Sequence, residues 1–157
     1  MSPSEPSPSA QLAAFMLRFP PKTVALGKKC LLWLRRKLPG AIQLVYDYNH
    51  SVVVAFGMSE QGIEAVFALA IYPKEVRLYV PKATADPKGL LQGSAGMVRF
   101  VVVESASYLD HKDIQALFKA AIKESGVKFP GTGPGRMVIK TGSKKKPKKA
   151  KKAKKAA

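Results

Sequence analysis

The sequence predicts an α+β domain in which helices cover one face of an antiparallel sheet. Apolar residues recur at helical spacing in two segments before residue 40 and again after residue 110. Between these segments, short β-branched runs alternate with a period of two. The connections between the runs are too short for parallel crossovers, so successive strands should be antiparallel neighbours. We therefore expect two N-terminal helices, a five-stranded meander and one C-terminal helix.

The expected domain begins with two helices. Residues 1–9 hold three prolines and four serines, which indicates a disordered lead and argues against a signal peptide. Residues 10–19 carry apolar side chains at helical spacing. Pro20 and Pro21 end that helix and open the next, because proline is tolerated in a first turn. The second helix should span residues 21–38 and end at Pro39-Gly40.

The second helix has an apolar half and a basic half. The basic half gathers four cations around Leu32: Lys28, Lys29, Arg35 and Arg36. One interpretation is a solvated charged face, which amphipathic helices commonly have. The other is a basic stripe that contacts phosphates.

Five strands should follow the helices. We expect them at residues 42–48, 51–58, 63–72, 76–80 and 97–103. Residues 136–140 form a candidate short edge strand.

The last helix has clear sequence boundaries. Asp110 is a good N-cap, and Asp113 would lie in the first turn, where the helix dipole favours a negative charge. Gly126 suits the left-handed residue that commonly ends a helix.

Four short motifs give the chain a family resemblance. They are LVYD at 44–47, AIYP at 70–73, DPKGLLQGS at 86–94 and MVRF at 97–100. In this order they resemble the YdhG-like family of small bacterial domains, over roughly residues 11–140. The resemblance implies an α+β fold and leaves the activity open, although one branch of the family is described as frataxin-like and iron-delivering.

Two departures from the family pattern argue against an iron role. Asp47-Tyr48-Asn49 replaces a Gly-Met-Pro, and Gln43 stands where a Glu is common. Ten acids are scattered among 27 bases, whereas a hard cation needs several converging oxygen ligands. We therefore expect no metal site and no cofactor.

The C-terminal tail points to a class of partner. Residues 140–157 hold ten lysines and no acid: Lys140, Lys144, Lys145, Lys146, Lys148, Lys149, Lys151, Lys152, Lys154 and Lys155. This segment has no large apolar side chain to bury, so we expect it to be disordered. Its spacing is similar to that of linker-histone tails, and dense positive charge favours a polyanion such as DNA. The alternative is a tail that only raises solubility or directs localisation.

The rest of the chain shares the positive charge but lacks a motif for sequence readout. The net charge is +17, and residues 10–139 remain at +8, with 17 bases and 9 acids. No aromatic residue interrupts the tail, so base stacking and sequence readout are not expected.

Catalytic constellations are missing from the sequence. Cys30 lies on the apolar half of a helix, which predicts a small buried hydrophobe and not a reactive thiolate. The loop at residues 81–96 is long, and it has two interpretations. Leu90 and Leu91 could close the open end of the sheet. Alternatively, the loop could border a pocket for a small anion, lined by Tyr46, Tyr79, Lys88, Gln92 and Arg99.

Two functional hypotheses follow from these features. The first is a non-enzymatic protein with a disordered lead at 1–9, a YdhG-like domain at 10–139 and a tail at 140–157 that binds nucleic acid without sequence specificity. The second is a small-molecule or metal (iron) binding or chaperone module whose tail only solubilises or localises it. No apolar run is long enough for a membrane span. We expect a cytoplasmic location, with which association with the nucleoid is compatible.

Overall fold

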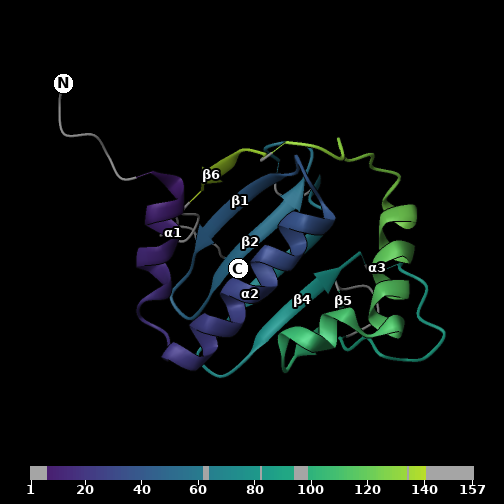
Figure 1. Ribbon diagram of the computed structural model, residues 1–157, viewed down its shortest axis with the longest axis horizontal. Coiled ribbons are helices and arrows are strands. Elements are labelled where there is room, and N and C mark those ends of the chain that lie inside the picture. The colour runs from purple at the N-terminus through teal and green to yellow at the C-terminus, as the bar shows by residue number, and fades with distance from the viewer. Residues whose placement is uncertain (1–6, 62–63, 82, 94–98, 134, 141–157) are drawn as a thin grey trace, which may run out of the picture.

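A computed structural model describes residues 7–61, 64–81, 83–93, 99–133 and 135–140. Over these residues the chain has the predicted α+β fold, with three α-helices and a six-stranded sheet (Figure 1). The helices are α1 (Pro8–Met16), α2 (Pro21–Lys37) and α3 (Lys112–Ser125), and the 3-10 helix η2 (Ala106–Asp110) precedes α3. The strands are β1 (Ile42–Asp47), β2 (Val52–Gly57), β3 (Phe67–Ile71), β4 (Val76–Val80), β5 (Arg99–Val103) and β6 (Met137–Ile139).

The sheet is mixed, which corrects the prediction of five antiparallel strands. Its order is β5-β4-β3-β2-β1-β6, and β1 to β5 form the expected antiparallel meander. The candidate edge strand β6 adds a sixth strand and pairs with β1 in parallel. The reason is the path after α3. Gly131 donates its N–H to the Pro39 carbonyl, which brings the chain back to the end where β1 begins. Because β1 and β6 begin at the same end of the sheet, they run parallel to each other.

Helix α1 begins earlier than predicted. Ser7 is its N-cap and accepts a hydrogen bond from the Ala10 N–H at 3.1 Å, and Pro8 occupies the first turn. Serine at the cap followed by proline is a favoured helix start. Residues 7–9 therefore belong to the folded domain, and residues 1–6 of the predicted lead lie outside the described part.

The N-cap of α3 is His111 and not Asp110. The His111 Nδ1 accepts a hydrogen bond from the Asp113 N–H at 3.2 Å. The Asp110 carboxylate lies at the end of η2 and accepts the indole N–H of Trp33 at 3.0 Å instead. A contact between distant segments thus outweighs local capping preference. The predicted helix end is confirmed, because Gly126 has φ 70°.

The strands β1, β2 and β3 are shorter than predicted, and β3 differs most, because it spans Phe67–Ile71 and not residues 63–72. The described part of β5 begins at Arg99, and residues 62–63 and 97–98 lie outside the described part. In the loop before β5, the Asp86 carboxylate accepts the N–H groups of Leu90 and Leu91 at 2.8 and 2.9 Å. The two leucines pack against the core, which supports the interpretation that they close the end of the sheet.

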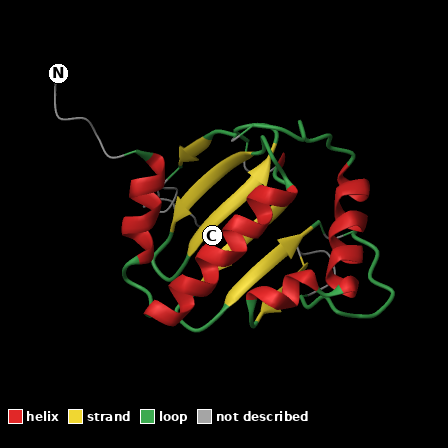
Figure 2. Ribbon diagram, in the orientation of Figure 1, coloured by secondary structure: helices red, strands yellow, loops and turns green. Residues whose placement is uncertain are grey.

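All three α-helices contribute to one core on a single face of the sheet (Figures 1 and 2). Phe67 of β3 stacks on Phe118 of α3 with ring centroids 4.3 Å apart, and Trp33 of α2 meets Phe118 edge-on at 4.9 Å. Gly27 lets α2 approach the sheet closely, since a Cβ at this position would lie 2.7 Å from the Ile71 Cδ1. None of the helices in the described ranges has both the length and the apolar character that a bilayer span requires.

Candidate nucleic-acid interface

Helix α2 carries a concentrated positive charge. It holds six bases and no acid: Lys22, Lys28, Lys29, Arg35, Arg36 and Lys37. All but the half-buried Arg35 are exposed. Two rows repeat at seven-residue spacing, which places successive members two turns, or about 10.5 Å, apart. Lys22, Lys29 and Arg36 form the outer row, and Lys28 and Arg35 form the row nearer α1. We call these five residues the α2 basic stripe.

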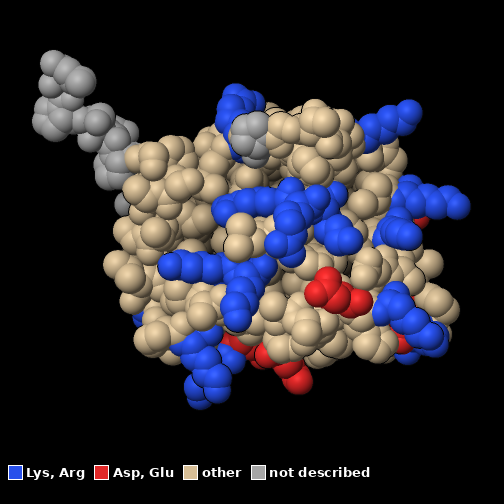
Figure 3. Space-filling model, in the orientation of Figure 1, with Lys and Arg blue, Asp and Glu red and all other residues tan. Residues whose placement is uncertain are grey.

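The α2 basic stripe has no carboxylate partner among the described residues. Elsewhere in the domain, arginines pair with acids: Arg18 lies 2.7 Å from Asp47, and Arg136 lies 2.6 Å from Glu60. Within the described part, no stripe residue lies within 4.0 Å of an acidic side chain. Figure 3 shows basic side chains gathered over the centre of this view, where α2 lies. The charge of the stripe is therefore left for solvent or for an external anion.

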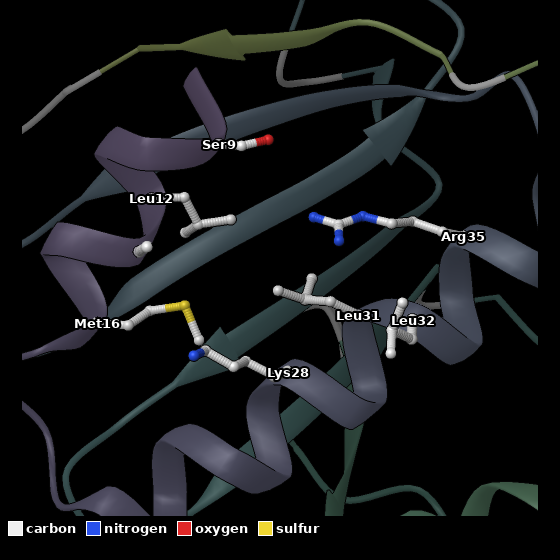
Figure 4. Close-up of a pocket in the computed structure, with 8 residues that line it drawn as sticks. Ser9, Leu12, Met16, Lys28, Leu31, Leu32 and Arg35 are labelled. Atoms are coloured by element: carbon white, nitrogen blue, oxygen red, sulfur yellow. The ribbon is translucent and has the colours of Figure 1, made fainter. Parts of the chain in front are cut away.

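At the centre of the stripe, Leu32 is 53 % exposed, as the helical wheel predicted. Beside it, a groove of about 270 Å³ separates α1 from α2 (Figure 4). Leu12 and Met16 of α1 and Leu31 of α2 line the groove with apolar surface. Lys28 and Arg35 extend from α2 toward this space. The groove thus combines an apolar lining with two cationic groups.

Arg35 is the most confined cation of the stripe. Its Nε–H donates to the Gln43 Oε1 at 2.9 Å, which fixes the guanidinium against β1. Burial lowers the pKa of Arg35 from its ordinary value, because a low-dielectric setting disfavours the charged form. A bound anion would offset this cost.

The lysine tail leaves the domain at the edge of the sheet. The Lys140 N–H donates to the Val45 carbonyl at 2.7 Å, so the predicted phosphate-binding segment begins directly after β6. Lys140 is half-buried. The other nine predicted tail lysines, from Lys144 to Lys155, lie outside the described residues.

The five predicted pocket residues line different parts of the surface. Tyr46 and Tyr79 face one trough on the sheet. Lys88 lies 3.9 Å from Asp113 in a hollow beside α3, and Gln92 borders a third hollow with Tyr108. The Arg99 guanidinium donates to the Thr84 carbonyl. The structure thus brings together only the two tyrosines.

The trough is a feature that the sequence interpretation missed. It lies on the sheet face opposite the helices, and its volume is about 870 Å³. Four tyrosines line it: Tyr46, Tyr48, Tyr72 and Tyr79. Tyrosines at alternating positions 46 and 48 were a signal for one shared face. Which face the helices would leave open was not visible in the pattern, because both faces carry apolar residues.

The remaining candidates for chemistry are Cys30 and the side chains that could bind a metal ion. Cys30 is fully buried, and burial raises the pKa of its thiol to about 12. It is therefore the inert core residue that its place on the helix predicted. Over the described residues, no three His, Cys, Asp or Glu side chains are grouped closely enough to hold a metal ion.

Comparisons with protein-family models, with curated proteins and with solved structures found no match for the chain.

Proposed function

We propose that this protein is a non-enzymatic nucleic-acid-binding protein that contacts phosphates without reading sequence. The lysine tail is the main contact, and the α2 basic stripe adds a second, ordered one. The observation that supports the proposal most is that the stripe has no acidic partner in the described part of the domain. Each phosphate that a lysine or arginine neutralises releases condensed counterions, which favours binding entropically.

A salt titration tests this proposal. Fluorescence anisotropy would follow the binding of a labelled random-sequence duplex to the full chain and to a truncation ending at Ile139. Six to ten phosphate contacts predict that affinity falls by about 10³–10⁵ between 50 and 200 mM salt. The truncation should bind more weakly and with a shallower salt slope. No binding by the full chain near physiological salt would contradict the proposal.

A charge-reversal pair tests the role of α2. Lys29→Glu with Arg36→Glu should weaken duplex binding by the full chain. The matched control is Lys119→Glu with Lys128→Glu, because both lysines are exposed, lie outside α2 and give the same change in net charge. If the two pairs of substitutions lowered the affinity for the duplex equally, only the overall charge would matter, and α2 would not be a contact surface.

The α1–α2 groove favours a second candidate function, the binding of a small anionic amphiphile. The supporting observation is Arg35, a half-buried cation beside an apolar lining, with no acidic partner among the described residues. Dodecanoate should raise the melting temperature of the full chain. Arg35→Gln should lose this shift, and dodecanol should produce a smaller one. The tail is unchanged in that variant, so its own affinity for anions cancels in the comparison.

A further inference from the structure

The trough on the open face of the sheet has two aromatic walls. On one side, the rings of Tyr46 and Tyr48 lie nearly parallel, at 3°, with centroids 5.9 Å apart. On the other side, the hydroxyls of Tyr72 and Tyr79 are 3.1 Å apart, and Tyr79 packs against Phe100 at 5.2 Å. Both walls lie on the open face of the sheet, on either side of β2. Tyr46 of β1 and Tyr48 just after it form the first wall, and Tyr72 just after β3 and Tyr79 of β4 form the second.

The floor between the walls is made of small side chains. Strand pairing places Val53, Ala55 and Ala68 across the middle strands β2 and β3. On the opposite face, the same strands present large residues such as Leu69, which is fully buried. The small floor leaves a hollow of about 870 Å³ that no described segment of the chain fills. It is therefore a recessed apolar surface between aromatic rings.

The second wall is held rigid by one arginine. The Arg77 guanidinium lies 4.8 Å from the Tyr72 ring centroid and 4.3 Å from that of Phe100. It also forms an ion pair with Glu75 and donates to the Tyr79 hydroxyl at 3.2 Å. The hydrogen-bonded rings lose little further freedom when a ligand packs on them, which favours binding.

The lysine tail begins beside the first wall. Because β6 runs parallel to β1 and the Lys140 N–H bonds to the Val45 carbonyl, Lys140 lies level with Tyr46. The trough crosses four strands, β1 to β4, which is a width of about 14 Å at the usual strand spacing. Because β6 lies one strand beyond β1, the far side of the trough at β4 is about 19 Å from Lys140. Six extended residues can span this distance, and the lysine run continues to residue 155, so the tail is long enough to reach across the trough.

We infer that the trough binds the unpaired bases of single-stranded nucleic acid, while the adjacent lysine tail neutralises the phosphates of the same strand. Aromatic platforms for the bases and positive charge along the backbone are the two components of sequence-tolerant single-strand binding. A duplex cannot use the trough, because its bases are stacked inside the helix. The tail has no aromatic residue, and the tyrosines of the sheet supply the rings on which bases can stack. This inference rests on the proposed function for the phosphate contacts only.

The test compares two double variants in the full chain. Tyr46→Ala with Tyr48→Ala removes the first wall, whereas Tyr46→Phe with Tyr48→Phe keeps both rings. Anisotropy would be measured with a labelled 12-nucleotide mixed-sequence single strand and with the matching duplex. The alanine pair should weaken single-strand binding at least fivefold, since stacking is worth about 1–3 kcal/mol per base. The phenylalanine pair should bind within twofold of the wild type, and neither pair should change duplex binding.

Three outcomes would overturn the inference. One is that the folded alanine pair binds the single strand as well as the wild type. Another is that it weakens single strand and duplex equally. A third is a concentration-dependent dimer in analytical ultracentrifugation that the alanine pair abolishes, because the face would then bind a second copy. Thermal melting establishes whether each variant folds. If the alanine pair does not fold, Tyr48→Ala alone replaces it, because Tyr48 is 38 % exposed.

The two proposals fail in different ways. If the tail truncation binds duplex as well as the full chain does, the proposed role of the tail is wrong. Loss of single-strand binding by the alanine pair alone would still support the trough in that case. If the truncation abolishes all binding while the alanine pair changes nothing, the tail acts alone and the trough does not bind bases.

Discussion

The two faces of the sheet come from the same strands but differ in how they are filled. The covered face presents large apolar residues, among them Val54, Leu69 and Leu78, which are fully or almost fully buried beneath the helices. The open face carries tyrosines at its sides and alanine and valine in the middle. Successive side chains along a strand point to opposite faces, so the same strands can carry large apolar residues on one face and small residues with tyrosines on the other.

This difference separates stability from binding. Burial of large side chains on the covered face provides most of the hydrophobic free energy of folding. The open face retains aromatic surface that the fold does not bury completely, since Tyr46, Tyr72 and Tyr79 are only half-buried. Substitutions on the first face should change unfolding, and those on the second should change binding.

The largest expected effect on stability is at the centre of the covered face. Leu69→Ala should lower the free energy of unfolding by about 2–5 kcal/mol, because it leaves a cavity beneath the helices. Val53→Ala on the open face should cost only about 1 kcal/mol, since Val53 is half-buried. Urea denaturation measures both values. Similar losses would mean that the two faces do not differ as described.

A smaller loss is expected where α2 approaches the sheet. Gly27→Ala would place a Cβ 2.7 Å from the Ile71 Cδ1. Such overpacking costs about 1–3 kcal/mol, of which the better helix propensity of alanine recovers about 1 kcal/mol. The exposed Ala25→Gly is a control in the same helix and should cost about 1 kcal/mol through helix propensity alone. Thermal or urea unfolding of both variants tests this prediction, which fails if Gly27→Ala stabilises the protein by the amount of about 1 kcal/mol that helix propensity alone predicts.

The buried thiol predicts a loss of stability at alkaline pH. The pKa of Cys30 is about 12 in the folded protein and 9.0 for an ordinary thiol, so the unfolded chain releases its proton first. The stabilising contribution is complete below pH 9 and is lost as the pH rises from 9 to 12. At pH 10 the expected loss is about 1 kcal/mol.

The control for this prediction is Cys30→Ala. Its stability should fall less between pH 7 and pH 10 than that of the wild type, as followed by urea unfolding at each pH. The comparison is needed because burial also raises the pKa of Tyr46, Tyr48 and Tyr72. An identical fall in both proteins would assign the effect to the tyrosines and not to the thiol.

The smallest effect is expected at the second aromatic wall. Tyr72→Phe removes the hydroxyl that lies 3.1 Å from the Tyr79 hydroxyl and should cost at most about 1 kcal/mol. It keeps the ring, so single-strand binding should remain within twofold of the wild type. Urea unfolding and anisotropy give the two values. A large loss of binding would mean that the trough recognises its ligand by hydrogen bonds.

Sequence patterns predicted the meander and the helices because these depend on local periodicity. They did not predict the pairing of β6, a strand of only three residues that follows a glycine-rich loop. Its parallel direction depends on the Gly131–Pro39 contact, which brings distant segments together. The cap of α3 was missed for a similar reason, since Trp33 takes the carboxylate of Asp110.

The candidate site was predicted in part. The charge on α2 was visible because lysines and arginines cluster at helical spacing, and the exposed Leu32 at its centre confirms the orientation of that helix. The anion pocket failed as a group because Lys88 and Gln92 lie on a loop whose path the pattern did not indicate. The trough was hidden because alanine and valine at its floor have the composition of a buried core.

The edges of the sheet have a consequence for aggregation. On one side the sheet ends at β6, a strand of only three residues, and at the opposite edge Gln92 exchanges backbone hydrogen bonds with Phe100 at 2.8 and 3.0 Å. Exposed strand edges pair readily between molecules, and such pairing leads to insoluble assemblies. If many copies bind one polyanion, as proposed, their local concentration rises greatly. The two blunted edges would then keep neighbouring copies from joining their sheets.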